Sequence, residues 1–345
     1  MNPVQADATI PAVTPVPPER ALVAVSRLLI HTPGNRREAA RRFIASAPNH
    51  GIDPALMWAT WDERGLPRET CLAVCGSGRT ATLFLAPPDP AKAGGSPKAE
   101  PSPNSARAER AQVVRAALTH LRGLGRARVA LAQALAAPDE PWAATAFSDA
   151  GMRCVGTLLY LRRPMENPWG TPGAPELPPH FGLRSLAEIG NEAAWRPLLV
   201  DLLDRTYVGT LDCPGLCGLR ETSDVLDSHL AVGKWDPRLW FVLFEGERAV
   251  GCMLLSRLPE FRSVELVYIG LSPEARGRGL GESLMRHGVR AAGGAGVEEL
   301  TCAVDQGNHP AMAMYTRTGF LQFGSRSAFV APLGEPVEES AGVVS

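Results

Sequence analysis

The sequence predicts an α+β protein built as two mixed α/β sandwiches, each a sheet flanked by helices. Three observations lead to this prediction. The chain has 345 residues, enough for two ordinary domains. The same order of strands and helices occurs twice along it. Segments rich in proline and small residues separate the two copies.

The composition is that of a folded protein without a polyanionic partner. Hydrophobic residues make up 45% and charged residues 21% of the chain, and the formal net charge is −1. This balance gives no electrostatic reason to expect nucleic acid or an anionic membrane as partner. No apolar run of membrane-spanning length and no signal peptide pattern occurs, and the seven cysteines are an odd count. We therefore expect a cytoplasmic protein with reduced thiols.

The second half of the chain gives the clearer element pattern. Two strands over 239–258 join at a turn near Gly246, and a third strand covers 262–273. The expected elements that follow are a helix over 282–296, a strand over 299–304, a short helix around 309–320 and a strand over 325–332.

The first half repeats this order. Its counterparts are strands within 55–75 and 80–88, a helix over 108–125, a strand over 127–135, a helical element over 141–151 and a strand over 154–163. The last strand of each copy is expected to complete the sheet of its own domain. The expected organisation is a disordered leader (1–19), a first domain (20–163) with a low-complexity insertion (87–105), a linker (164–179), a second domain (180–333) and a tail (334–345).

The stretch "EARGRGLGES", 274–283, follows a buried strand and precedes a helix. Gly277, Gly279 and Gly281 lack a Cβ, so their backbone can adopt positive φ and approach a ligand closely. The N–H groups at the helix start and the helix dipole favour an anion such as pyrophosphate, and Arg276 and Arg278 add positive charge. Taken alone, the pattern also fits a glycine-rich turn with solvated arginines. Its place after a third strand argues against a Rossmann unit.

Two motifs carry a family resemblance. Residues Arg276, Gly279 and Gly281 fit Q/R-x-x-G-x-G/A, and Asn308, Ala311, Tyr315, Gly319 and Phe320 fit N-x-x-A-x-x-x-Y-x-x-x-G-F. Together they resemble the GNAT superfamily of acyl-CoA-dependent N-acetyltransferases, over residues 180–333 and less closely over 20–163. The tandem arrangement is similar to that of mycothiol synthases, without defining the acceptor. The first copy lacks the glycine motif and has Phe147 in place of Tyr315, so we expect a degenerate GNAT domain there.

The resemblance implies acetyl-CoA as co-substrate and no metal. The residues expected to bind the pyrophosphate with their backbone are Arg276, Gly277, Arg278, Gly279, Leu280 and Gly281. Ile269, Gly270 and Leu271 are expected to hydrogen-bond the pantetheine arm, and one of their N–H groups to polarise the thioester carbonyl. Asn308 is placed to hold the pantetheine as well, and it also fits a helix N-cap.

Two residues are expected to carry the chemistry. Glu265 lies in an otherwise apolar strand, at the position of the catalytic carboxylate in mycothiol synthase-like domains; the alternative is a salt bridge to Arg262 or Arg257. Tyr315 is the expected general acid, and the alternative is a core aromatic residue. Cys302, in the strand over 299–304, is expected to be a buried, unreactive cysteine.

The acceptor wall is expected in the loop over 205–224, where GNAT proteins form it. Tyr207, Asp212 and Arg220 are the polar candidates there, and each also fits a capped irregular loop. Cys213 and Cys217 have no second pair of ligands nearby, so we expect no zinc. The sequence thus predicts an acetyl-CoA-dependent N-acetyltransferase acting by direct transfer on a small-molecule or protein amine. A non-catalytic acetyl-CoA sensor or interaction module is the alternative.

Overall fold

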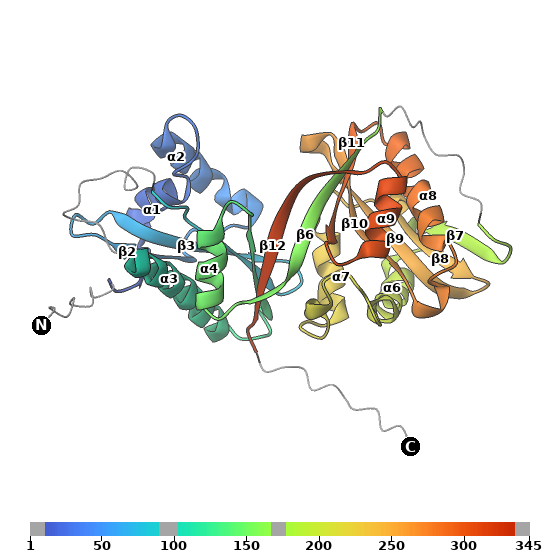
Figure 1. The fold of residues 1–345 in the computed structure, drawn as a ribbon, viewed down its shortest axis with the longest axis horizontal. Helices are drawn as coiled ribbons and strands as arrows, with labels where there is room; N and C mark the ends of the chain where they lie inside the picture. The colour runs from blue at the N-terminus through green and yellow to red at the C-terminus, as the bar shows by residue number, and fades with distance from the viewer. Residues whose placement is uncertain (1–10, 90–102, 167–176, 335–345) are drawn as a thin grey trace, which may run out of the picture. The chain divides into compact units, whose positions relative to one another are not determined.

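The structure is a computed structural model that describes residues 11–89, 103–166 and 177–334. These residues form two compact units (Figure 1). Unit 1 contains the described residues up to Cys154 and those from Ser327 onward, and unit 2 contains the described residues of Val155–Arg326. Each unit contains a run of neighbouring sheet strands, with helices on the faces of those strands.

Unit 1 carries a sheet with the strand order β1-β2-β3-β4-β5-β12. Its strands are β1 (Thr14–Pro15), β2 (Met57–Trp61), β3 (Pro67–Gly76), β4 (Thr80–Leu85), β5 (Leu131–Ala136) and the second part of β12 (Leu321–Pro332). Its helices are α1 (Ala21–Leu28), α2 (Arg36–Ser46), α3 (Pro103–Gly123) and α4 (Pro141–Asp149).

Unit 2 carries a sheet with the strand order β6-β11-β10-β9-β8-β7. Its strands are β6 (Arg153–Pro164, from residue 155), β7 (Phe181–Ser185), β8 (Trp240–Glu245), β9 (Arg248–Leu258), β10 (Ser263–Leu271) and β11 (Glu299–Asp305). Its helices are α5 (Leu186–Ile189), α6 (Glu192–Tyr207), α7 (Thr222–Leu230), α8 (Leu280–Gly294) and α9 (His309–Arg317). The repeated order of elements confirms the predicted tandem α+β fold.

The sequence analysis expected the last strand of each copy to complete the sheet of its own half. In the structure, each of these strands pairs instead with a strand of the other copy. β6 pairs antiparallel with β11 in unit 2, with Cys302 opposite Leu161. The end of β12 pairs antiparallel with β5 in unit 1, with Phe329 opposite Ala134. The compact units therefore differ from the expected ranges 20–163 and 180–333. The alternation of residues along a strand sets which side chains face the core, but it does not say which sheet accepts the strand.

The expected leader needs correction over its described part. Thr14 and Pro15 pair with Ala59 and Trp58 of β2, and Val16 is buried. Residues 11–19 therefore belong to the fold, while residues 1–10 lie outside the described residues. The same holds for 90–102 of the expected insertion, whose last residues begin α3, for 167–176 of the linker and for 335–345 of the tail.

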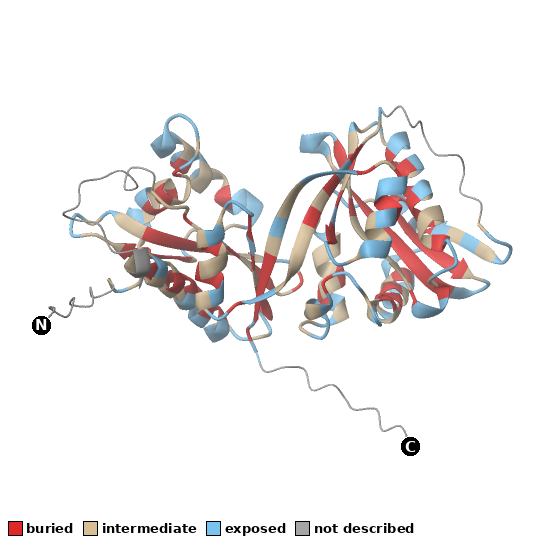
Figure 2. Ribbon diagram, viewed as in Figure 1, coloured by how far each residue is buried: buried red, intermediate tan, exposed pale blue. Residues whose placement is uncertain are grey.

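The central strands of unit 2 are buried on both faces (Figure 2). On one face, Leu255 and Leu266 pack with Leu284 of α8 and Met314 of α9. Residues of α6 and α7 cover the other face, where they pack on side chains such as Leu254. β10 therefore has a helical layer above and below it, and its side chains alternate between the two layers.

Candidate functional site

The site of unit 2 begins where β10 and β11 separate. The parallel pairing of these strands runs from Ser263 opposite Glu299 to Leu266 opposite Cys302 and goes no further. A β-bulge at Val267 shifts the register, because Leu266 faces Leu255 of β9 whereas Tyr268 faces Leu254. Beyond the bulge, Tyr268–Leu271 continue to pair with β9 only, among the described strands. Over residues 268–271, the edge of β10 on the side of β11 therefore has no partner strand among the described residues. Its backbone groups are available for hydrogen bonds with a ligand.

The glycine-arginine loop follows this open edge and leads into α8. Gly277 and Gly279 have φ of 71° and 76°, a conformation that favours glycine. Among the described residues, the N–H groups of residues 277–279 donate to no backbone carbonyl, and residues 280–281 form the first turn of α8. A Cβ built on Gly277 or Gly279 would meet no atom within 4 Å. The loop therefore presents a group of N–H donors in open space, which fits a pyrophosphate.

The two arginine side chains of this loop are already engaged. Arg276 donates from Nε to the carbonyl of Leu271 (3.0 Å) and from its two terminal nitrogens to those of Thr206 (2.8 Å) and Gly209 (3.1 Å). Arg278 pairs with Glu245 (2.9 Å) and lies over the Phe181 ring. The structure thus leaves anion binding mainly to the backbone of the loop.

Ile269, Gly270 and Leu271 line the open edge of β10. Ile269 and Leu271 pack their side chains toward α8 and α9. A Cβ on Gly270 would collide with the Tyr268 ring and hydroxyl, because this ring covers the glycine. Glycine is therefore required at position 270 by the packing of a neighbouring tyrosine.

Glu265 is the half-buried carboxylate next to the point of separation. Val264 and Leu266 face α8 and α9, so Glu265 faces the α6 and α7 side of the sheet. Burial raises the pKa of the Glu265 carboxyl. The expected alternative, a salt bridge to Arg262 or Arg257, is absent among the described residues, and Arg262 pairs instead with Glu298.

Tyr315 lies on the opposite face, in the layer of α8 and α9. Its side chain is 4% exposed and its ring packs edge-on against Phe320 at 5.2 Å. Burial raises the pKa of Tyr315 well above that of a free phenol, and the nearby Cys302 and Asp212 raise it further. Tyr315 and Cys302 belong to the same cluster of buried side chains. Because Cys302 pairs with Leu266, Tyr315 reaches the same point of strand separation as Glu265, from the other face.

Asn308 caps α9. Its side-chain oxygen accepts the Ala311 N–H at 3.3 Å. The preceding Asp305 is buried and accepts the N–H groups of Cys213 (3.0 Å) and Gly307 (2.7 Å). Asp305 also donates its own N–H to Asp212, at 2.8 Å from the Asp212 Oδ1. These bonds hold the α6–α7 loop against the end of β11 and the start of α9.

The expected acceptor residues lie on the α6 and α7 side, together with two aromatic residues that the sequence analysis did not single out. The Tyr207 ring packs edge-on against Tyr268 at 5.7 Å, and the His229 ring stacks on Tyr268 at 5.6 Å. Burial lowers the pKa of His229 to about 4, with a smaller contribution from Arg220. Arg220 donates to the Ser228 hydroxyl at 2.8 Å. His229 and Tyr268 belong to no short motif, so only the fold brings them together.

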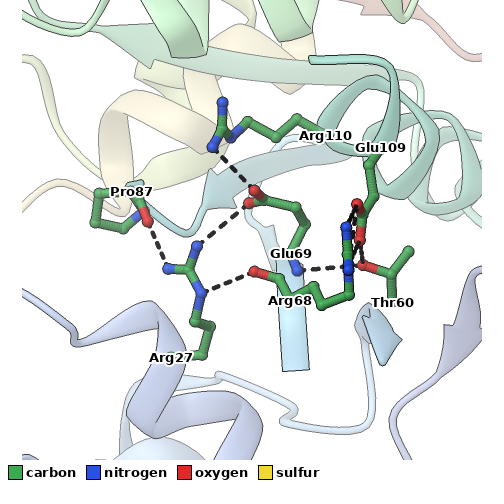
Figure 3. A network of polar contacts seen from close by, with 7 residues as sticks. All are labelled: Arg27, Thr60, Arg68, Glu69, Pro87, Glu109 and Arg110. Atoms are coloured by element: carbon green, nitrogen blue, oxygen red, sulfur yellow. Dashed lines mark hydrogen bonds and ion pairs between the residues drawn. The ribbon is translucent and has the colours of Figure 1, made fainter. Parts of the chain in front are cut away.

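Unit 1 has a network of buried charges where α1, β3 and α3 meet (Figure 3). Glu69 pairs with Arg27 (3.4 Å) and Arg110 (2.9 Å). Arg27 also donates to the carbonyl of Pro87, just after β4. The remaining members of the network are Arg68, Glu109 and Thr60. The Glu109 carboxylate accepts hydrogen bonds from the Arg68 guanidinium and the Thr60 hydroxyl. The network ties the second turn of α3 to β3 by side chains, in the copy that lacks the glycine motif.

The described residues show neither a metal centre nor a membrane helix. Over 11–89, 103–166 and 177–334, no group of three His, Cys, Asp or Glu side chains is arranged to hold a metal ion. In the same part of the chain, no helix is both long and apolar enough to cross a membrane. All seven cysteines are free thiols.

Comparison with known proteins identifies the class of the domain that holds this site. Residues 203–320 match the Acetyltransferase (GNAT) family, so this part of the chain is a GNAT acetyltransferase domain. The expected resemblance is confirmed.

The chain is also similar in sequence to several mycothiol acetyltransferases. The chain is 30% identical over 174 residues to a mycothiol acetyltransferase of Streptomyces bingchenggensis, covering 48% of this chain and 53% of that protein. It is 29% identical over 226 residues to a mycothiol acetyltransferase of Frankia casuarinae, covering 59% and 62%. The chain thus spans about half the length of the first of these relatives.

A solved structure shows the same fold. The GCN5-related N-acetyltransferase of Sphaerobacter thermophilus superposes with a TM-score of 0.58 at 16% identity, over 94% of this chain and 96% of that one. At this identity the similarity establishes the fold alone.

Proposed function

We propose that this protein is an acetyl-CoA-dependent N-acetyltransferase whose unit 2 transfers the acetyl group directly to an amine in a ternary complex. The observation that carries the proposal is the open edge of β10, which runs into a loop of unpaired N–H groups at the start of α8. The open edge accommodates an extended chain and the loop accommodates a pyrophosphate. Acetyl-CoA has both parts, and the match to the acetyltransferase family supports it.

Glu265 is the proposed general base and Tyr315 the proposed general acid. The two residues flank the end of strand pairing from opposite faces, as shown by their neighbours Leu266 and Cys302. The amine nitrogen forms a bond to the carbonyl carbon while the carbon–sulfur bond breaks. Glu265 accepts the proton released by the amine, and the Tyr315 phenol donates a proton to the departing thiolate. A backbone N–H of the open edge stabilises the carbonyl oxygen during the transfer.

The proposed cofactor residues follow from the same geometry. The backbone of 276–281 holds the pyrophosphate and the edge of 269–271 holds the pantetheine arm. Asn308 is proposed to bind the pantetheine with its amide nitrogen, since its oxygen caps α9. Residues 20–163, which lack the glycine motif, are proposed to be a degenerate GNAT-like copy, and residues 180–333 the catalytic copy.

The acceptor is proposed to be a small-molecule or protein amine that binds beside Tyr207, Asp212 and Arg220. The acceptor of the mycothiol acetyltransferases is the first to test, because the relatives bear that name. The free cysteines support a cytoplasmic location for the reaction.

The competing function is an acetyl-CoA sensor that binds without turnover. Thiol release from acetyl-CoA, measured across a panel of amines and peptides with mass analysis of the products, separates the two. The proposal predicts an acceptor that gains one acetyl group for each thiol released. Tight acetyl-CoA binding with no acetylated product on any acceptor would favour the sensor.

A further inference from the structure

The side chain of Arg276 joins the cofactor loop to the acceptor side of the site. All three of its bonds go to backbone carbonyls, those of Leu271 at the end of β10 and of Thr206 and Gly209 at the end of α6. Carbonyls in the last turn of a helix have no partner within the helix, and a positive charge there also interacts favourably with the helix dipole. Arg276 is therefore a clamp between three backbone segments.

Two other contacts connect the same segments. The Thr206 hydroxyl is hydrogen-bonded to the Tyr268 hydroxyl at 2.8 Å, and Tyr268 covers Gly270 on the open edge of β10. Glu274, two residues before Arg276, pairs with Arg248 at 2.8 Å and lies 3.8 Å from Arg205 of α6. The end of α6 is thus bound to both parts of the cofactor site, the loop and the strand.

The segment that Arg276 holds continues directly into the proposed acceptor wall. Gly209 lies near the beginning of the α6–α7 loop, whose Asp212 and Cys213 are bonded to Asp305 at the end of β11. Val208 and Leu211 in this loop are 60% and 52% exposed. The loop therefore has few apolar contacts of its own, and its position depends on polar contacts at its two ends.

We propose that Arg276 is a positioning residue that couples occupation of the cofactor loop to the order of residues 204–213 on the acceptor side. The inference rests on the proposed function, because it takes the loop of 277–281 to be the pyrophosphate site. A ligand held by those N–H groups fixes the backbone directly after Arg276, and the clamp transmits this restraint to the end of α6. In this account the motif arginine acts on the acceptor loop and not on the phosphate.

Hydrogen exchange of the full chain, with and without coenzyme A as probe, tests the coupling. In the parent protein, saturating coenzyme A is expected to slow exchange in 277–283 and, by about 5-fold or more, in 204–213. Arg276→Lys keeps the charge but cannot donate to three carbonyls in the fork geometry of a guanidinium. It is expected to keep the effect in 277–283 and to reduce the effect in 204–213 to less than about 2-fold.

Arg278→Ala is the matched control. It removes a positive charge from the same loop, but Arg278 contacts Glu245 and Phe181 and not α6. At saturating coenzyme A it is expected to keep the slowing in 204–213. Slowing of 204–213 that persists in Arg276→Lys, or that is lost equally in Arg278→Ala, would overturn the coupling. Protection of 277–283 without any effect on 204–213 in the parent protein would also overturn it while leaving the cofactor site intact. Failure to protect 277–283 would contradict the proposed cofactor site itself.

Discussion

Glu265 combines burial with the lack of an ion-pair partner among the described residues. Burial raises its pKa above the value of about 4.3 expected in the unfolded chain. As pH rises through the window from that value to the raised native value, the unfolded state loses its proton first, so the stability of the fold decreases. Above this window the ionised carboxylate destabilises the fold by a constant amount. The loss of stability thus falls on the residue that we propose as the general base.

Glu265→Gln should therefore have two effects of opposite sign. We expect kcat to fall by about 10²-fold, because the base is lost, and the thermal midpoint at pH 7 to rise, because an unpaired buried charge is removed. Steady-state kinetics and thermal melts check the two effects. Glu299→Gln, which changes a half-buried carboxylate on the neighbouring strand, should show neither. A variant that lost stability and kept its turnover would mean that Glu265 is structural.

Tyr315→Phe removes the hydroxyl group of Tyr315 and keeps its aromatic ring. The ring packs on Phe320 and is kept, whereas the hydroxyl, the proposed proton donor, is removed. We expect kcat to fall by about 10²-fold with little change in acetyl-CoA affinity. Kinetics with the acceptor identified by the amine panel, together with calorimetry, check this. A kcat within a few-fold of the parent value, under conditions where chemistry limits the rate, would show that Tyr315 is not the acid.

At the scale of elements, the sequence was sufficient to predict local features. The glycines, the N-cap at Asn308 and the strand-loop-helix order depend on neighbouring residues, and the structure has them where the sequence analysis placed them. The pairing of β6 with β11 and of β12 with β5 was not predictable, because the residues along a strand do not say which sheet it joins. The partners of Arg276 could not be foreseen either. All three are backbone carbonyls, two of them about 70 residues away, and carbonyls leave no signal in a sequence.

Unit 1 holds a buried charge network that the sequence analysis did not predict. Burial raises the pKa of Glu69, and the charges of Arg110 and Arg27 oppose this shift. Glu69→Ala would leave the buried Arg27 side chain without its counter-charge, so we expect a loss of about 3 kcal/mol in the free energy of unfolding. Urea unfolding monitored by a unit 1 signal, such as the buried Trp58, checks this.

Arg107→Ala is the control for the network, because Arg107 and Asp149 form a mostly exposed ion pair in the same unit. This variant should unfold at nearly the same urea concentration as the parent. If Glu69→Ala changed the urea midpoint as little as Arg107→Ala, the buried charge network would contribute nothing to the stability of unit 1.

At the scale of the whole molecule, the two units share an order of elements but differ at the anion loop. Only unit 2 has the glycine motif, and in unit 1 the second turn of α3 is bonded to β3 through Glu109 and Arg110. The account therefore predicts one acetyl-CoA site per chain.

Calorimetric titration of acetyl-CoA into the intact protein tests this central claim most directly, with Gly279→Val as the comparison. Valine at φ 76° is strained, and its side chain would occupy the space in front of the loop's N–H groups. The parent protein should bind one equivalent tightly, and the variant, if its circular dichroism matches the parent, should bind at least about 100-fold more weakly. Two sites of similar affinity, or a folded Gly279→Val protein that binds as tightly as the parent, would contradict the account.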